Sequence, residues 1–365
     1  MPSAIDVVRW LGAVQSQDYS GAMWGLAQRT TETTQAQLDR LFDAGAILRT
    51  HVMRPTWHFV LPDDIGWLVD LTGSRVRRGQ AGRYRELGIG DDEVSRATDV
   101  LCSALAGGRF LTRPELGQAL QAAGIPPDGQ RLPHFLMAAE LDGAIVSGPR
   151  RGKQFTYALL AERAPQARTL DPSAALAALT RRYFRSHGPA QLQDFVWWSG
   201  LTVSDARSGL ALAAGDLDRC VVADKEYWFD ADAVSPEATS PLAHLLPNWD
   251  EYTVGYRDRE AVLALERPFD PSLFAFGSVL SNVVTLLSTL VAMLILSWQL
   301  TALSLAFRAL AMDRPVHPSR CRSHARSRRH SRQSRGERSA IVSTTTGVAD
   351  PWHGVHMLTP ASVGR

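Results

Sequence analysis

The chain has 365 residues, 45% hydrophobic and 21% charged, which excludes a disordered or fibrous protein and gives room for two to four small domains. The net charge of +2 hides an asymmetry, because residues 308–365 carry 11 arginines and 3 acidic residues, a charge of +8, which leaves −6 for the rest. The scattered Cys102, Cys220 and Cys321 exclude a disulfide framework and a zinc site, and residues 1–25 lack a signal-peptide pattern, so we expect a cytoplasmic protein without a bound metal.

The first region, residues 1–88, predicts helices followed by two short strands. The predicted elements are helices at residues 2–14 and 33–45 and two β-rich runs within residues 46–60. Thr33 or Thr34 is the expected N-cap of the second helix, and Gly45 is its expected end. The two β-rich runs are broken at Arg54 and Pro55.

Two glutamines, Gln15 and Gln17, stand at the end of the first apolar run and just before a Gly-rich stretch that we expect to be a turn. Glutamine is neither an acid nor a base at ordinary pH. The pair is therefore either two plain helix-end residues or a site whose chemistry needs hydrogen bonds rather than proton transfer.

The same order of elements returns twice. Residues 89–168 predict a helix at 91–107, a short strand followed by a helix within 109–124, a helix at 130–143 and a hairpin at 144–160. Residues 169–235 predict helices at 171–188, 189–200 and 202–215 and a hairpin at 220–234. Thr112 is the expected cap of a helix with Pro114 in its first turn, and the last hairpin turns at Ala223 to Lys225. Helices followed by a two-stranded hairpin are the order of a winged helix. We therefore expect an α+β fold of three tandem winged-helix units.

The remaining chain changes in character. We expect a truncated small β-region at residues 236–276, whose stretch 243–259 has the composition of strands and turns. Residues 277–310 form an uncharged apolar run up to Phe307 that is long enough to cross a bilayer, so they predict a membrane-like helix. Residues 311–365 are rich in arginine and poor in apolar residues, which predicts a disordered basic tail.

Basic residues gather at two of the predicted hairpins. The turn of the second hairpin carries Arg150, Arg151 and Lys153, which either lie in solvent or contact a phosphate backbone. The first hairpin carries Arg49 and Arg54, which we predict to contact DNA, together with His51 and His58. A histidine on a strand is more often a structural residue than a catalyst, so neither histidine is assigned a chemical role.

The sequence offers no conventional catalytic group. Asp250 and Glu251 are adjacent, and on a strand they would face opposite sides, so they do not predict a pair of carboxylates for acid and base catalysis. Either one could still cap a turn or approach a cleft. No arrangement of Ser, His and Asp stands out, and the scarcity of lysine makes a Schiff-base mechanism unattractive.

Five stretches together resemble one family. They are LGAVQSQDYSGAMWGLAQRT, ILRTHVMRPTWHFVLPDDI, ELDGAIVSGPRRGKQFTYALL, RYFRSHGPAQLQDFVWWSGLT and HLLPNWDEYTVGYRDR. In this order they resemble the tandem winged-helix DNA-binding proteins of the azinomycin-resistance DNA glycosylase type, over roughly residues 3–265. The apolar run after residue 277 resembles instead a membrane helix of an ATP-driven exporter, as a gene fusion would produce.

The resemblance implies that a Gln-x-Gln motif carries the chemistry, and this motif falls on Gln15, Ser16 and Gln17. The implied reaction is excision of bulky N7-alkylated purines from double-stranded DNA, alkylated or crosslinked, by a monomer without a small-molecule cofactor. Two alternatives stay open: a non-catalytic or regulatory DNA-binding protein, and a non-functional fusion product. Membrane association would occur only through the C-terminal apolar segment.

Overall fold

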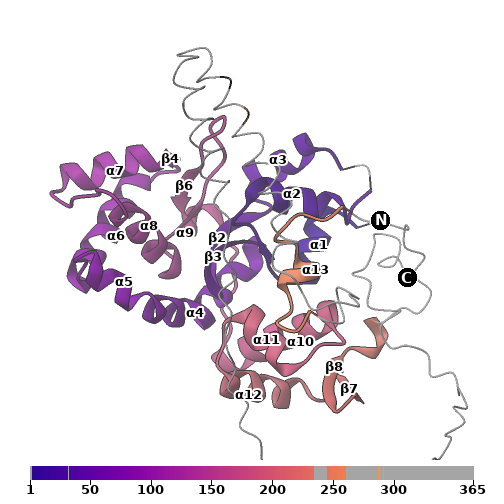
Figure 1. Cartoon of the computed structure of the whole chain (residues 1–365). Helices are drawn as coiled ribbons and strands as arrows, with labels where there is room; N and C mark the ends of the chain where they lie inside the picture. The colour runs from indigo at the N-terminus through magenta and orange to yellow at the C-terminus, as the bar shows by residue number, and fades with distance from the viewer. Residues whose placement is uncertain (1, 32, 234–244, 260–286, 288–290, 292–365) are drawn as a thin grey trace, which may run out of the picture. The chain divides into compact units, whose positions relative to one another are not determined.

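The computed structural model describes residues 2–31, 33–233 and 245–259, together with residues 287 and 291. The chain divides into two compact units, one of residues 1–269 and 350–365 and one of residues 270–349. All the elements named below belong to the first unit (Figure 1). They form a mixed α+β structure, as the sequence predicts.

The first region is built from three helices and a three-stranded sheet. Its elements are α1 (Ala4–Leu11), β1 (Val14–Gln15), α2 (Tyr19–Ala27), α3 (Gln35–Asp43), β2 (Leu48–Val52) and β3 (Arg54–Val60). Capping boxes start α1 at Ser3 and α3 at Thr34, which confirms the second of the two predicted caps. The sheet is antiparallel in the order β1-β3-β2, so β1 is an edge strand.

The predicted Gly-rich turn after the glutamines is wrong, because the structure has helix α2 there, capped by the side chain of Asp18. Glycines in this helix serve close packing. A Cβ atom on Gly25 would lie 2.9 Å from Oδ2 of Asp250, so only glycine lets the distant segment around Asp250 approach.

The second region has its own core. Helices α4 (Pro62–Gly79) and α5 (Ala81–Glu86) follow the first hairpin within residues 1–88 and lead into the second region. The elements of the second region are α6 (Asp91–Leu105), β4 (Leu111–Thr112), α7 (Arg113–Ala122), α8 (Arg131–Leu141), β5 (Ile145–Ser147), β6 (Thr156–Leu159) and α9 (Leu160–Arg163). Thr112 and Glu115 form the capping box of α7, with Pro114 in its first turn as predicted. The antiparallel sheet has the order β4-β6-β5, and side chains of α6, α7 and α8 pack into one apolar cluster.

The third region contains α10 (Pro172–His187), α11 (Leu192–Ser199), α12 (Val203–Ala213), β7 (Asp218–Val222), β8 (Lys225–Phe229) and the short 3-10 helix η1 (Ala231–Ala233). The hairpin turns at Ala223 and Asp224, both with positive φ, at the predicted position. In chain order, therefore, each of the three regions has helices followed by an antiparallel hairpin.

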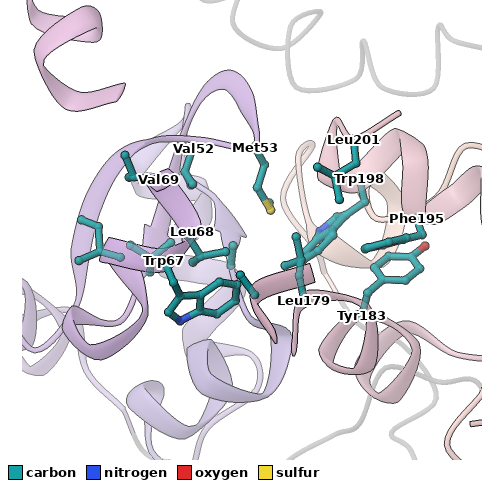
Figure 2. Packing of buried hydrophobic residues seen from close by; sticks show 14 of the residues in the cluster. Val52, Met53, Trp67, Leu68, Val69, Leu179, Tyr183, Phe195, Trp198 and Leu201 are labelled. Carbon is teal, nitrogen blue, oxygen red and sulfur yellow. The ribbon is translucent and has the colours of Figure 1, made fainter. Parts of the chain in front are cut away.

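One apolar core joins the first and third regions and also takes in Val146, Leu160 and Ala164 of the second. Figure 2 shows Met53 and Trp67, from the first hairpin and α4, facing Tyr183, Phe195 and Trp198 from α10 and α11. Trp67, Tyr183, Phe195 and Trp198 are almost completely buried. The two regions are thus held together by aromatic packing.

Residues 245–259, which we call the strap, contain a single short helix, α13 (Glu251–Val254). The strands predicted for this stretch are wrong, because Asp250 caps a helix there, whereas turns are present on either side of the helix. The other residues of the predicted β-region 236–276, the predicted apolar helix 277–310 except for residues 287 and 291, and the predicted tail 311–365 lie outside the described residues. Among the helices that the structure describes, none has the length and apolar character needed to span a membrane.

Candidate functional site

The Gln-Ser-Gln motif leaves the sheet at the end of β1. Gln15 pairs with His58 in the register of β1 and β3, and the N–H of Ser16 donates to the carbonyl oxygen of Trp57 at 2.8 Å. Gln17 is exposed, and its Oε1 accepts from the N–H of Trp57 at 3.4 Å. Gln15 is only 7% exposed and Ser16 is fully buried. The two glutamines therefore occupy different environments, one inside the protein and one at its surface.

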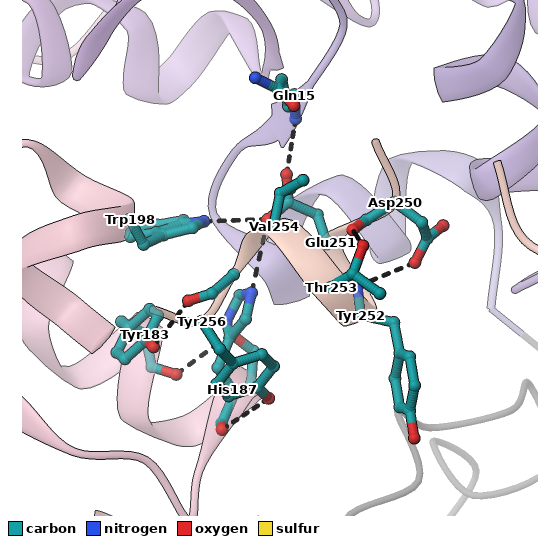
Figure 3. Close-up of polar contacts among 12 residues, drawn as sticks. Gln15, Tyr183, His187, Trp198, Asp250, Glu251, Tyr252, Thr253, Val254 and Tyr256 are labelled. Atoms are coloured by element: carbon teal, nitrogen blue, oxygen red, sulfur yellow. Dashed lines mark hydrogen bonds and ion pairs between the residues drawn. The ribbon is translucent and has the colours of Figure 1, made fainter. Parts of the chain in front are cut away.

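The backbone of Gln15 is held by a carboxylate from the strap. Its N–H donates to Oε1 of Glu251 at 2.6 Å, while Oε2 of Glu251 accepts from Nε1 of Trp198 at 2.9 Å and lies 3.6 Å from Nε2 of His187 (Figure 3). Glu251 is 1% exposed. Burial favours its neutral form, but the His187 imidazole and the N–H of Gln15 outweigh burial and hold the pKa of Glu251 below its ordinary value. The carboxylate is therefore ionised at neutral pH.

The neighbouring carboxylate, Asp250, binds a different partner. Its two oxygens accept from the guanidinium of Arg29, just beyond the end of α2, at 2.6 and 2.9 Å, and Oδ1 also caps α13 through the N–H of Tyr252. Nε1 of Trp24 on α2 donates to the carbonyl oxygen of Leu245 at 2.7 Å. The strap is thus tied to α2 at several points. Because α13 is a helix, Asp250 and Glu251 do not face opposite sides of a strand as the sequence suggested.

A small cavity of about 10 Å³ lies where the motif, α2 and the strap meet. Its lining includes Gln15, Arg29, Asp250 and Glu251. This volume is close to the space that one water molecule needs. A larger cavity of about 710 Å³, between α4, α5 and α6, shares no lining residue with it and lies apart from the motif.

Arg49 supports the motif from inside. Its Nε donates to the carbonyl oxygen of Ser16 at 3.0 Å, and its guanidinium lies 4.3 Å from the ring of Trp57 and 4.7 Å from that of Phe155. Burial lowers the pKa of Arg49 to about 10. The predicted contact of Arg49 with DNA therefore does not fit its position, because the side chain is enclosed by protein.

The two histidines of the first hairpin, His51 and His58, are both buried inside the protein. His51 pairs with the buried Glu140 of α8, and its ring lies 4.3 Å from that of Trp57. His58 is fully buried, and burial lowers its pKa to about 3, so it is neutral at pH 7. Arg54 is half-buried, with two guanidinium nitrogens that have no protein partner among the described residues. Burial lowers the pKa of Arg54.

The basic residues in the turn of the second hairpin differ in their exposure to solvent. Arg151 and Lys153 are exposed, and Arg151 pairs with Glu115 at 2.8 Å. Arg150 is half-buried, with its guanidinium 4.9 Å from the ring of Tyr19. Arg113, at the start of α7, lies 6.0 Å from the ring of Trp57 beside the motif, and no motif in the sequence marks this residue. Its position next to a proline in a capped helix gave no signal of this closeness.

Within the parts of the chain that the structure describes, no group of three or more His, Cys, Asp or Glu side chains could hold a metal ion. Burial raises the pKa of the Cys102 and Cys220 thiols, so neither is an activated nucleophile. Within the Gln-Ser-Gln motif, the side chain of Gln17 is exposed, whereas Gln15 and Ser16 are buried.

Comparisons with known proteins agree with one another. The sequence model of a family described as DNA glycosylase AlkZ-like matches residues 8–270. A Streptomyces sahachiroi protein described as an interstrand DNA cross-link repair glycosylase is 29% identical over 280 residues, which cover 73% of this chain and 75% of the relative. The solved structure of the Streptomyces sahachiroi DNA glycosylase AlkZ matches with a TM-score of 0.60 and 23% identity, over 73% of this chain and 77% of the other. The family match ends before residue 277, so the resemblance of residues 277–310 to an exporter helix stays a prediction.

Proposed function

This chain belongs to the family of AlkZ-like DNA glycosylases, and on that premise we propose that it excises bulky N7-alkylated purines from double-stranded DNA through Gln15 and Gln17. The family membership makes it a homologue of DNA repair glycosylases. The identity of the damaged base and the roles of Gln15 and Gln17 go beyond the family membership, and these are what we propose. The observation that carries it is the exposed amide of Gln17 on a motif whose backbone is fixed from both sides.

The chemistry suits amides rather than acids. An N7-alkylated purine is cationic and leaves readily, so its departure needs little help from a proton donor. The bond from the sugar C1′ to the base breaks, the base leaves with both electrons as a neutral alkylpurine, and water adds to C1′ and releases a proton. An amide carbonyl can hold that water and stabilise the positive charge that develops on the sugar. Gln17 is placed to do this at the surface, whereas Gln15 acts from beneath it.

DNA contact is proposed for the basic residues that face outward. Arg151 and Lys153 project from the second hairpin, and Arg113 lies close to the motif. Arg54 is kept in the set from the sequence prediction, although the two guanidinium nitrogens that have no hydrogen-bond partner among the described residues are buried, and Arg150 contributes through the part of its side chain that is exposed. Neutralising phosphates with such residues gives affinity that does not depend on sequence.

We further propose that the three helix-and-hairpin regions are winged-helix modules. Their order of helices and hairpins supports this, as does the similarity to the AlkZ structure. We propose that the protein acts on this DNA in the cytoplasm, as a monomer without a cofactor.

The test is release of N7-alkylguanine from alkylated duplex DNA by the full chain. Gln17→Ala and Gln15→Ala should each lower the single-turnover rate by about 100-fold or more, the scale of losing one preorganised polar group, with little change in DNA affinity. Gln130→Ala, at an exposed glutamine on α8's N-cap, is the matched control and should leave the rate unchanged.

The outcomes separate the alternatives. If the wild-type protein binds duplex DNA but releases no base, a non-catalytic binding protein is the better description. If the wild-type protein neither binds DNA nor releases a base, a non-functional fusion product is the better description. If both glutamine variants excise as fast as wild type, the amides are structural.

A further inference from the structure

We propose that Glu251 is a positioning residue for the reaction, and that its buried carboxylate fixes the Gln-Ser-Gln motif by holding the N–H of Gln15. The inference rests on the proposed function of the motif and assigns a part in it to a residue of the distant strap. Glu251 touches no substrate in this scheme and acts through Gln15.

The geometry of an edge strand explains why Gln15 needs such a partner. In the antiparallel pairing of β1 with β3, Ser16 directs its N–H to β3, so the N–H of Gln15 points away from the sheet. An edge-strand N–H would normally meet water, but here the residue is buried. Glu251 supplies the acceptor, at 2.6 Å and from 236 residues further along the chain.

The side chain of Gln15 cannot fix itself. Its Oε1 is buried and has no hydrogen-bond partner among the described residues. No hydrogen bond at Oε1 therefore fixes this amide, and its position depends on the packing around it and on the backbone that carries it. That backbone is held at the N–H of Gln15 by Glu251, and at Ser16 by Trp57 and Arg49.

Glu251 is itself held rigidly, which a positioning residue requires. Its second oxygen accepts from Trp198 of α11, a fully buried side chain, and lies 3.6 Å from Nε2 of His187. The strap around it is fixed by two buried tyrosines. Tyr183 donates to the carbonyl oxygen of Gly255, and Tyr256 donates to that of His187, both at 2.9 Å (Figure 3). The third region thus serves as the support on which the motif of the first region is aligned.

A purely structural explanation accounts poorly for this carboxylate. A buried ionised group is costly, and an apolar replacement that packs well is often as stable. A neutral oxygen could also satisfy one backbone N–H. A charged acceptor makes a stronger and more directional hydrogen bond. The proposed reaction depends on the exact placement of an amide, so it requires such a bond.

The test compares the two adjacent carboxylates of the strap. Glu251→Gln keeps the shape but sets an NH₂ group against either the N–H of Gln15 or the indole N–H of Trp198. Asp250→Asn is the matched control, because it weakens the tie to Arg29 while an amide oxygen can still cap α13, and the Asp250 carboxylate makes no hydrogen bond with the motif. The readouts for each full-length variant are the melting temperature, the Kd for duplex DNA, the single-turnover rate of base release per folded protein, and amide hydrogen exchange in residues 12–18.

We expect Glu251→Gln to lower the release rate by about 10- to 100-fold, the scale of misplacing a reacting group, with Kd changed by less than about 2-fold. Exchange in residues 12–18 should become faster. Asp250→Asn should lower the melting temperature and leave the rate per folded protein nearly unchanged. The double variant Glu251→Gln with Trp198→Phe removes the competing indole donor, so the new amide carbonyl can serve Gln15 and part of the rate should return.

Equal rates for Glu251→Gln and wild type would overturn the inference while leaving the proposed function intact. A wild-type protein that releases no base would overturn the proposed function instead, and the exchange of residues 12–18 would then decide whether Glu251 holds the motif. If Glu251→Gln fails to fold, Glu251→Asp, which keeps the charge but withdraws the acceptor, takes its place. Unchanged exchange and rate in that variant would count equally against the inference.

Discussion

The first hairpin (β2 and β3) and the second hairpin (β5 and β6) carry similar basic residues, yet the structure uses them differently. Arg49 and His51 of the first hairpin are buried and bound to protein groups. Arg151 and Lys153 of the second hairpin are exposed. The reason is their neighbours, because the first hairpin packs against α4, α8 and β5, whereas the turn of the second projects from the protein. A basic hairpin is therefore a stronger DNA-contact candidate where no second layer of protein covers it.

The largest effect should come from breaking the buried pair of the first hairpin. His51→Ala leaves Glu140 buried without its partner, so we expect a loss of about 3–5 kcal/mol in the free energy of unfolding. Urea unfolding measures this. Arg151→Ala breaks an exposed pair with Glu115 in the second hairpin, and it should cost less than about 1 kcal/mol. Similar losses in the two variants would remove the distinction between the hairpins.

The second-largest effect on stability should come from acid, through His58 of the first hairpin. The folded pKa of His58, about 3, lies below the unfolded value of about 6.5, so the unfolded chain binds the extra proton first. Stability should therefore fall as pH drops below about 6.5, by about 1.4 kcal/mol per pH unit from this residue, until the folded pKa is reached. Urea unfolding at pH 7 and at pH 5 should show a difference of about 2 kcal/mol that His58→Gln abolishes. The same pH dependence in wild type and variant would contradict the assignment.

A smaller effect is expected from Arg49→Lys. The variant keeps the charge but loses the planar group that stacks on Trp57 and donates to Ser16, so it should lose about 1 kcal/mol of stability. The rate of base release should fall as well, since Ser16 belongs to the motif. Unfolding and single-turnover assays of one preparation check both. A variant that weakens DNA binding alone would mean that Arg49 contacts phosphate after all.

The smallest effect on stability should come from the second hairpin. Replacing Arg150, Arg151 and Lys153 by Ala should change the free energy of unfolding by less than about 1 kcal/mol. It should weaken binding to every DNA sequence alike and reduce the salt dependence by about one slope unit per lost phosphate contact. Titrations at several salt concentrations measure the slope. An unchanged slope would mean that these residues lie in solvent and contact no phosphate.

Local signals in the sequence predicted local structure. The cap at Thr34, the capping box at Thr112 and the turn at Ala223 and Asp224 depend on residues within a few positions of each other, and all three are present. Helix α2 was missed because Gly21 and Gly25 resemble a turn, and their reason is the close approach of Asp250 and Pro247.

The site was predictable only in part. The resemblance to a family placed the glutamines, but nothing near Glu251 in the sequence indicates that it binds the N–H of Gln15. Burial of Arg49 likewise depends on Phe155, more than a hundred residues away. Periodicity and composition report on neighbours in sequence, so contacts of this kind are beyond their reach.

The bond between Gln15 and Glu251 also dictates when the motif can become ordered during synthesis. The motif leaves the ribosome early, and its holding carboxylate follows 236 residues later. At the usual 5–20 residues per second, this is a delay of about 10–50 s. For that time the edge of β1 lacks its cover, and an uncovered edge strand can pair with other chains. The strap, which is made late, therefore completes the first region, which is made early. Slow translation of the regions between them would lengthen the period in which the nascent chain can aggregate.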